Sequence, residues 1–178
     1  MTSHGPTGYP QRKVPRLKEY DYGQPGYYFV TICAAGKKHL FGEVAAGQME
    51  RTTVGVIAAE EVEQIGRHRE NVRIEKWVVM PNHIHMIVRI TGRDMTCHVR
   101  PALDRFSHPE KGALPMVIGA YKAAVTRRVR AAMTSHGPTA LWQGRYFEHV
   151  IRNEQEYLQI VRYIDENPLK WELDEYHI

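Results

Sequence analysis

Three stretches of the chain have the composition or the alternation of β-strands. Residues 27–33 are almost all aromatic or β-branched, as in a buried strand. A second strand is expected from Trp77 to Ile90, and a third from Trp142 to Ile151. These strands would supply the sheet on which the remaining elements pack.

Three other stretches repeat apolar residues at helical spacing. The first covers about residues 54–69, and the second follows the apolar stripe of residues 117–129. The third is expected to begin at Asn153 as its cap, with Glu156 at the capping-box position, and to end before Pro168. The order strand, helix, strand, helix, strand, helix predicts an α+β fold with helices packed on one antiparallel sheet, and a ferredoxin-like arrangement fits this order.

The length of 178 residues suits a single domain with its own core. Residues 1–26 are rich in proline, glycine and basic side chains, so we expect an arm there and one domain over residues 27–174. Residues 91–115 show no steady period and predict a long loop. The heptapeptide MTSHGPT occurs at 1–7 and at 133–139, but no longer period accompanies it, so a repeat architecture is not indicated.

The composition of the chain indicates its expected cellular location. No stretch approaches the ~20 apolar residues that cross a bilayer, and the N-terminus lacks the apolar centre of a secretory signal. Cys33 and Cys97 are the only cysteines, which excludes a disulfide framework and a thiolate metal site. We therefore expect a cytoplasmic protein without a membrane partner.

The distribution of charge is more informative than the net charge of +4, which points mildly toward an acidic partner. No acidic residue lies between Glu110 and Glu148, whereas several basic residues do. They include Lys122, Arg127, Arg128, Arg130 and Arg145. A solvated helix face is the alternative, but cations without acids nearby in the sequence favour a nucleic acid as partner.

Two histidines lie in the second expected strand. Because side chains alternate along a strand, His83 and His85 share one face while Ile84 takes the other. Two imidazoles side by side on a rigid element make a natural pair of metal ligands, and the alternative is that each ring has a structural partner. A metal needs a further ligand, and we expect an oxygen donor from another element.

The last expected helix offers candidates for that oxygen donor and for a nucleophile. Tyr163 and Asn167 are four residues apart, so they lie one above the other along one edge of the apolar stripe. A phenol and an amide at that edge suit a nucleophile and a metal ligand. Taken without other information, the residues favour a plainer interpretation, in which Tyr163 packs at the core boundary and Asn167 ends the helix.

Several segments resemble those of one family of DNA-processing enzymes. Residues 81–85 (PNHIH) resemble the histidine–hydrophobic–histidine motif of HUH endonucleases, in the form found in single-tyrosine transposases. Residues 162–170 (RYIDENPLK) resemble the nucleophile segment of the REP-associated tyrosine transposase branch, in which tyrosine is followed after three residues by Asn-Pro. Residues 141–153 and 28–32 also resemble segments of that branch. The likeness spans roughly residues 20–173, without the expected loop.

This resemblance implies a ferredoxin-like HUH domain that nicks and joins single-stranded DNA near hairpins. His83, His85 and the amide oxygen of Asn167 would hold Mg²⁺ or Mn²⁺, and Tyr163 would attack the scissile phosphate. The products would be a 5′-phosphotyrosine and a free 3′-hydroxyl, which can later attack in reverse. The basic residues of the acid-free segment would contact phosphates, and the protein would act as a monomer or a homodimer.

Two other interpretations stay open from the sequence. The chain could be a catalytically silent module of the same fold that binds hairpin DNA or RNA, or a domesticated member that acts on repeated palindromes. A histidine-triad nucleotide hydrolase would also show alternating histidines on a strand. It would place a third histidine at position 87, where this chain has Ile87, so that class is disfavoured.

Overall fold

The computed structural model describes residues 24–67, 69–91, 114–133 and 137–177. The expected N-terminal arm and the expected loop over residues 91–115 therefore lie almost wholly outside the described residues. None of the helices in the described ranges is long and apolar enough to cross a membrane.

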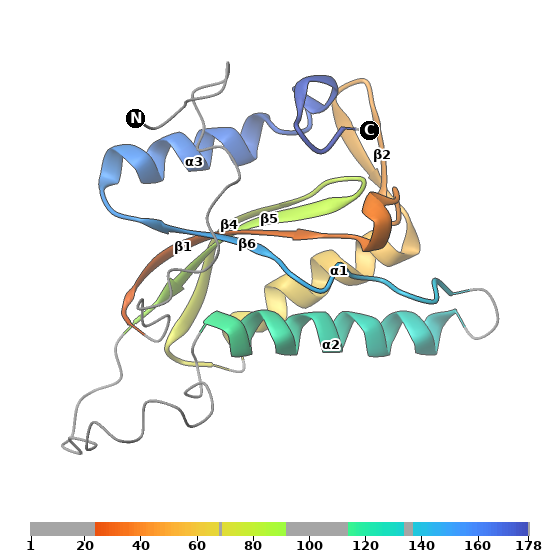
Figure 1. Ribbon diagram of the computed structural model, residues 1–178, viewed down its shortest axis with the longest axis horizontal. Coiled ribbons are helices and arrows are strands. Elements are labelled where there is room, and N and C mark those ends of the chain that lie inside the picture. The colour runs from red at the N-terminus through yellow and green to blue at the C-terminus, as the bar shows by residue number, and fades with distance from the viewer. Residues whose placement is uncertain (1–23, 68, 92–113, 134–136, 178) are drawn as a thin grey trace.

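A four-stranded antiparallel sheet forms the centre of the fold (Figure 1). Its strands lie in the order β4-β5-β1-β6. Helix α1 connects β1 to β4, and helix α2 connects β5 to β6. This connectivity gives the predicted ferredoxin-like α+β fold. The bounds are β1 Gly26–Cys33, α1 Thr53–Gln64, β4 Val72–Val79, β5 His83–Ile90, α2 Leu114–Ala132 and β6 Phe147–Ile151.

The prediction of one continuous strand over residues 77–90 is wrong, because this stretch forms parts of two strands. The chain reverses at Pro81, between β4 and β5, and the backbone N–H of Met80 donates to the carbonyl oxygen of His83 at 2.8 Å. Proline has no N–H to give to a ladder, so a turn is the favourable place for it. The apolar character of the whole stretch reflects two buried strands that pair with each other.

Two further differences concern short strands. The hairpin of β2 (Gly42–Ala45) and β3 (Gln48–Arg51) was not predicted, because its mostly exposed strands are too short for a clear alternation. The third expected strand is regular only in β6, and its first residue, Trp142, forms an isolated bridge to Ala34 at the end of β1.

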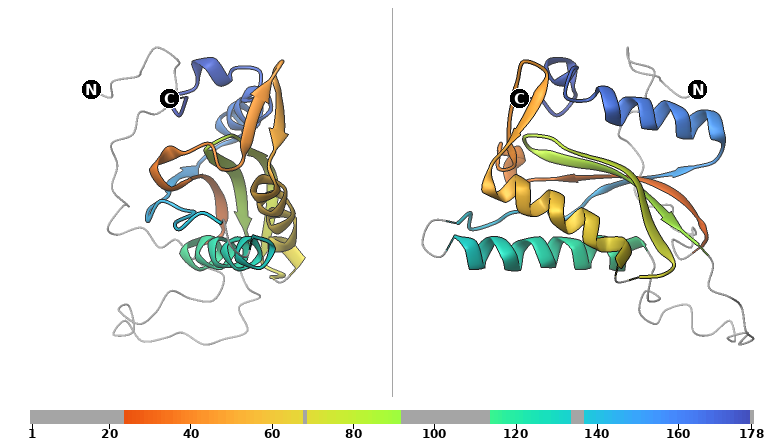
Figure 2. Two further views of the ribbon diagram at one scale, coloured as in Figure 1. Left: turned by 90° about the vertical axis from the view of Figure 1, so that its right-hand side faces the viewer. Right: turned by 180° about the vertical axis from the view of Figure 1, so that it is seen from behind.

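The helices cover the two faces of the sheet unequally, as Figures 1 and 2 show. Helices α1 and α2 lie on one face, where they bury alternate residues of β1 and β5 in the larger core cluster. Helix α3 (Glu154–Glu166) lies on the other face, where Ile160 and Ile164 pack over Phe29 and Ile87. Helix α3 thus forms a third layer, which packs against β5, the strand that carries His83 and His85.

The start of α3 is fixed by side-chain caps. Asn153 is the predicted cap, and its side-chain oxygen accepts from the backbone N–H of Glu156 at 2.9 Å. The carboxylate of Glu156 accepts from the backbone N–H of Arg152 at 2.7 Å and contacts His149 of β6 at 2.6 Å. These contacts set the angle at which α3 leaves β6 and crosses the sheet.

Gly55→Ala should lower the free energy of unfolding by about 1–3 kcal/mol, although alanine is the better helix former. In α1 a Cβ at Gly55 would overlap the carbonyl oxygen of Phe41, so the helix and the preceding loop would have to move apart. Gly119→Ala in α2 is the matched control, because a Cβ there meets nothing within 4 Å and should stabilise by about 0.5–1 kcal/mol. Urea unfolding measures the free energy of unfolding of both variants. Equal stabilisation by the two substitutions would contradict the close approach of Gly55 to the carbonyl oxygen of Phe41.

Candidate functional site

The two histidines lie at the beginning of β5, on the face covered by α3. Strand β5 lies between β4 and β1, and His83 pairs with Cys33 and His85 with Thr31 of β1. The histidines are therefore on an inner strand of the sheet. Both side chains are buried, and their Nε2 atoms are 2.9 Å apart. Alternation along the strand had predicted this shared face, which Ile87 also occupies.

Hydrogen bonds on the outer side of each ring orient the two imidazoles. Nδ1 of His83 lies 2.9 Å from Oδ1 of Asn82, whose Nδ2 donates to the carbonyl oxygen of Tyr176 at 2.8 Å. The amide orientation therefore places the proton of His83 on Nδ1. Nδ1 of His85 lies 2.9 Å from the hydroxyl of Thr31. In both rings the atom that faces the site is Nε2.

The separation of the two Nε2 atoms fits a pair of adjacent metal ligands. Two nitrogens bound at ~2.1 Å to one octahedral ion, at a right angle, lie ~3.0 Å apart. Burial lowers the pKa of His85 from 6.5 to about 3, so this ring is neutral at physiological pH. A neutral imidazole is the form that binds metals.

Tyr163 meets the histidine pair from α3. Its hydroxyl oxygen lies 3.2 Å from Nε2 of His85 and donates to Oδ2 of Asp174 at 3.3 Å. Its ring is partly buried and contacts Phe29 edge-on. Burial, and after it the negative charge of Asp174, raise the pKa of the Tyr163 phenol, so the group is protonated unless a cation stabilises its anion.

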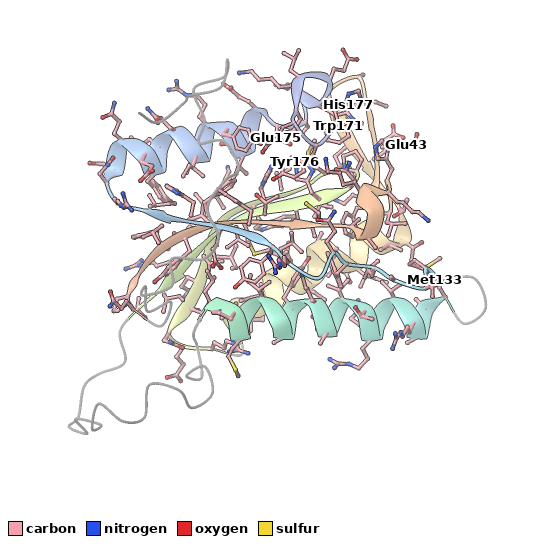
Figure 3. All side chains as sticks on the ribbon, viewed as in Figure 1. Glu43, Met133, Trp171, Glu175, Tyr176 and His177 are labelled. Atoms are coloured by element: carbon pink, nitrogen blue, oxygen red, sulfur yellow. The ribbon has the colours of Figure 1, made fainter. Side chains whose placement is uncertain are left out.

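Asp174 belongs to the site, although the sequence analysis did not single it out. The chain after α3 passes through the short helix η4 (Trp171–Leu173) and folds back over the histidines, where Trp171 and Tyr176 are labelled in Figure 3. Ligand atoms of His83, His85 and Asp174 all lie within 4.8 Å of one another. The buried aromatic residues of the tail were the one available signal that it packs against the domain.

Asn167 ends α3 directly beside this carboxylate. Its Nδ2 donates to Oδ2 of Asp174 at 2.9 Å, and its side chain is 2% exposed. Its Oδ1 is buried and has no hydrogen-bond partner among the described residues. A buried amide oxygen without a partner is costly, and a divalent cation would satisfy it. The donor set of two imidazoles, a carboxylate and this amide oxygen therefore fits Mg²⁺ or Mn²⁺.

Four of the predicted DNA-binding cations, Lys122, Arg127, Arg128 and Arg130, lie on α2, on the face of the sheet opposite the histidines, and Arg145 lies in the segment before β6. Arg127, Arg130 and Arg145 are exposed, whereas Lys122 is half-buried and donates to the carbonyl oxygen of Gln143 at 2.8 Å. The structure does not bring any of these cations into the histidine site.

The cations have no acids nearby in the sequence, as noted above, but Arg128 pairs with acids of another helix. Its guanidinium contacts Glu60 at 2.5 Å and Glu61 at 3.0 Å, both on α1. The acids come from a distant part of the sequence, which an acid-free stretch does not reveal. Arg128 therefore links α1 to α2, and we no longer count it among the candidates for phosphate contact.

Comparison with known proteins found a relative in sequence and several solved structures that match. An uncharacterized protein of Haemophilus influenzae is 35% identical over 184 residues, covering 100% of this chain and 99% of the relative. The structure of a REP-associated tyrosine transposase bound to a REP hairpin matches 89% of this chain and 74% of that chain, with a TM-score of 0.55 and 21% identity. A candidate transposase of Deinococcus radiodurans has a TM-score of 0.44 and 18% identity over 86% of this chain and 95% of its own. No model of a known protein family matches the chain.

The shifted pKa of His85 predicts a loss of stability in acid. The unfolded chain binds a proton at this residue near pH 6.5, whereas the folded chain does so only near pH 3. Between these values the unfolded state holds more protons, so the free energy of unfolding should fall as the pH is lowered, by up to about 1.4 kcal/mol per pH unit. Urea titrations with EDTA at several pH values measure this slope, and His85→Gln should reduce it. An unchanged slope in His85→Gln would count against a neutral buried His85.

Proposed function

We propose that this chain, which belongs to the same protein family as the Haemophilus influenzae relative, is a metal-dependent endonuclease and strand transferase acting on single-stranded DNA near hairpins. The observation that carries this proposal is the position of the Tyr163 hydroxyl, 3.2 Å from Nε2 of His85 and 3.3 Å from Asp174. A nucleophile held beside a candidate metal site, at the edge of its helix, is the arrangement that such chemistry needs.

The proposed reaction is a transesterification on a DNA phosphate. The Tyr163 oxygen forms a bond to phosphorus while the bond from phosphorus to the 3′-oxygen breaks. The phenol proton has an acceptor in Oδ2 of Asp174, and the leaving 3′-oxygen gains a proton to become a hydroxyl. The DNA is left with a 5′-phosphotyrosine, whose ester bond retains the energy of the phosphodiester. A 3′-hydroxyl can therefore attack it and rejoin the strand without a nucleotide cofactor.

Nε2 of His83 and Nε2 of His85 would hold the divalent metal, Mg²⁺ or Mn²⁺, with oxygens from Asp174 and Asn167. When bound, the metal supplies positive charge that polarises the phosphate and favours the phenolate. The carboxylate matters for metal choice, because Mg²⁺ and Mn²⁺ both prefer oxygen ligands over imidazole alone. We therefore add Asp174 to the ligands expected from the sequence, which were the two histidines and Asn167.

The fold supports the choice of substrate. The REP-associated tyrosine transposase of the same fold was solved with a REP hairpin, and the exposed arginines of α2 provide this chain with a surface for a polyanion. A module that binds DNA without cutting would have no need for a tyrosine hydroxyl within reach of two buried imidazoles. The catalytic proposal accounts for this cluster, and a silent module does not.

Wild-type protein should form a covalent adduct with hairpin DNA that carries single-stranded flanks, and Tyr163→Phe should not. The hairpins are taken from DNA flanking the gene and incubated with and without Mn²⁺, and a denaturing gel separates the adduct from free protein. Removal of the nucleophile should lower adduct formation at least about 1,000-fold while leaving hairpin affinity unchanged within about threefold. Adduct formation by Tyr163→Phe would exclude this tyrosine as nucleophile, and hairpin binding without any adduct would leave the silent module.

Binding of Mn²⁺, measured by titration calorimetry without DNA, tests the ligand set. His83→Gln should abolish detectable binding, and Asp174→Asn and Asn167→Ala should each weaken it at least about tenfold. Glu175→Gln is the control, because it removes an exposed carboxylate next to Asp174 and should leave the affinity unchanged. If Asn167→Ala weakens Mn²⁺ binding and Asp174→Asn does not, Asp174 is not a ligand.

A further inference from the structure

We propose that a pocket between α2 and the segment preceding β6 binds one unpaired nucleotide of the DNA strand, with the base against Trp142 and the phosphate at Arg127 and Arg130. This inference rests on the proposed function and adds a second DNA contact, on the sheet face opposite the histidines. The cavity has a volume of about 420 Å³. It is lined by Lys122, Ala123, Thr126, Arg127, Arg130 and Trp142.

The size and chemistry of the pocket fit a nucleotide. Sites for small ligands usually have ~300–1,000 Å³, with apolar walls and a few placed polar groups. Here Trp142 and Ala123 provide the apolar wall, and three cationic side chains line the rest together with Thr126. None of the described residues that line the cavity is acidic, so they do not repel an anionic ligand.

Trp142 is held in one orientation. Its Nε1 donates to the carbonyl oxygen of Lys122 and to the hydroxyl of Thr126, each at 3.1 Å. Its ring also contacts Phe41 and Tyr121 on the core side, with centroids 5.4 Å and 5.8 Å apart. The indole is therefore a fixed surface that is only partly buried, which is the property of a stacking platform.

Arg127 and Arg130 are placed to bind the phosphate. They are three residues apart on α2, so both project from the same side of the helix. Both are exposed, and neither forms an ion pair within the described part of the chain. Arg128 between them shows the contrast, because it turns toward α1 and pairs with acids there. These two arginines suit the phosphate of one nucleotide, and the apolar wall beside them suits its base.

One DNA strand can reach both the pocket and the tyrosine. Trp142 bridges to Ala34, the residue after Cys33, which pairs with His83. The backbones of Trp142 and His83 are thus at the same level of the sheet, about 10 Å apart across two strand spacings, and their side chains lie on opposite faces. Gly144 and Arg145, in the chain between Trp142 and β6, are exposed, and a Cβ at Gly144 would meet nothing within 4 Å. A strand passing around this edge meets no side chain at Gly144 and a further cation at Arg145.

The test compares full-length variants by fluorescence anisotropy in EDTA, which prevents cleavage. The probes are a mixed-sequence single strand of about 20 nucleotides and an abasic strand of the same length. Ala123→Glu places a negative charge in the pocket, and Ala132→Glu places the same charge at an exposed position on the opposite side of α2. Ala123→Glu should weaken binding of the mixed strand at least about fivefold, and Ala132→Glu less than twofold.

Removal of the bases from the DNA strand should weaken binding only in proteins whose pocket is not blocked by the Ala123→Glu substitution. The abasic strand should bind the wild type at least about fivefold more weakly than the mixed strand, and Ala123→Glu should bind both strands alike. Replacing Arg127 and Arg130 together by glutamine should reduce the magnitude of the slope of log affinity against log salt by about 0.7, the value for one phosphate contact. Arg67→Gln, an exposed arginine away from α2, should leave the slope unchanged.

Equal affinities for Ala123→Glu and Ala132→Glu would overturn the pocket, and equal binding of the two strands by the wild type would overturn base recognition. Circular dichroism confirms that each variant is folded, and the arginine pair tests the pocket without relying on a new glutamate. Failure of the proposed function has a different signature, because pocket-dependent binding would then persist in a protein that forms no Tyr163 adduct.

Discussion

Side chains of β5 alternate between the two faces of the sheet, and the rest of the structure depends on this alternation. Ile84 and Met86 enter the core beneath α1 and α2, while His83 and His85 face α3. A slip of one residue would put both imidazoles into an apolar core and leave isoleucine and methionine against the tyrosine. The turn at Pro81 opposes this slip, because it fixes which residues of β5 pair with β4.

Burial of so many polar groups at one place has a cost that the protein offsets only in part. Asn82 and Thr31 satisfy the outer nitrogens of the two rings. On the inner side, two Nε2 atoms lie 2.9 Å apart and the buried amide oxygen of Asn167 has no partner in the described ranges. Lone pairs that face one another repel unless a proton or a cation lies between them. A cation that relieves this repulsion would also stabilise the folded chain, so metal affinity and stability are expected to be linked.

Local signals explain which parts of this arrangement were predictable from the sequence. The cap at Asn153 and the shared face of His83 and His85 depend on residues a few positions apart, and both predictions are confirmed. Asp174 reaches the site only because the tail folds back after α3, and Arg128 finds acids on another helix. Such contacts depend on how distant elements pack, and neither periodicity nor charge counts along the chain carry that information.

The separation of the arginines of α2 from the histidines follows from the electrostatics of the site. Positive side chains beside His83 and His85 would compete with a metal ion, because like charges that share a buried site repel strongly. Polyanion binding nevertheless needs cations somewhere on the surface. Placing Arg127 and Arg130 on the opposite face puts the thickness of the sheet between the two functions. The proposed single-stranded substrate is compatible with this separation, since a flexible strand can turn around the exposed edge at Gly144 and a stiff duplex cannot.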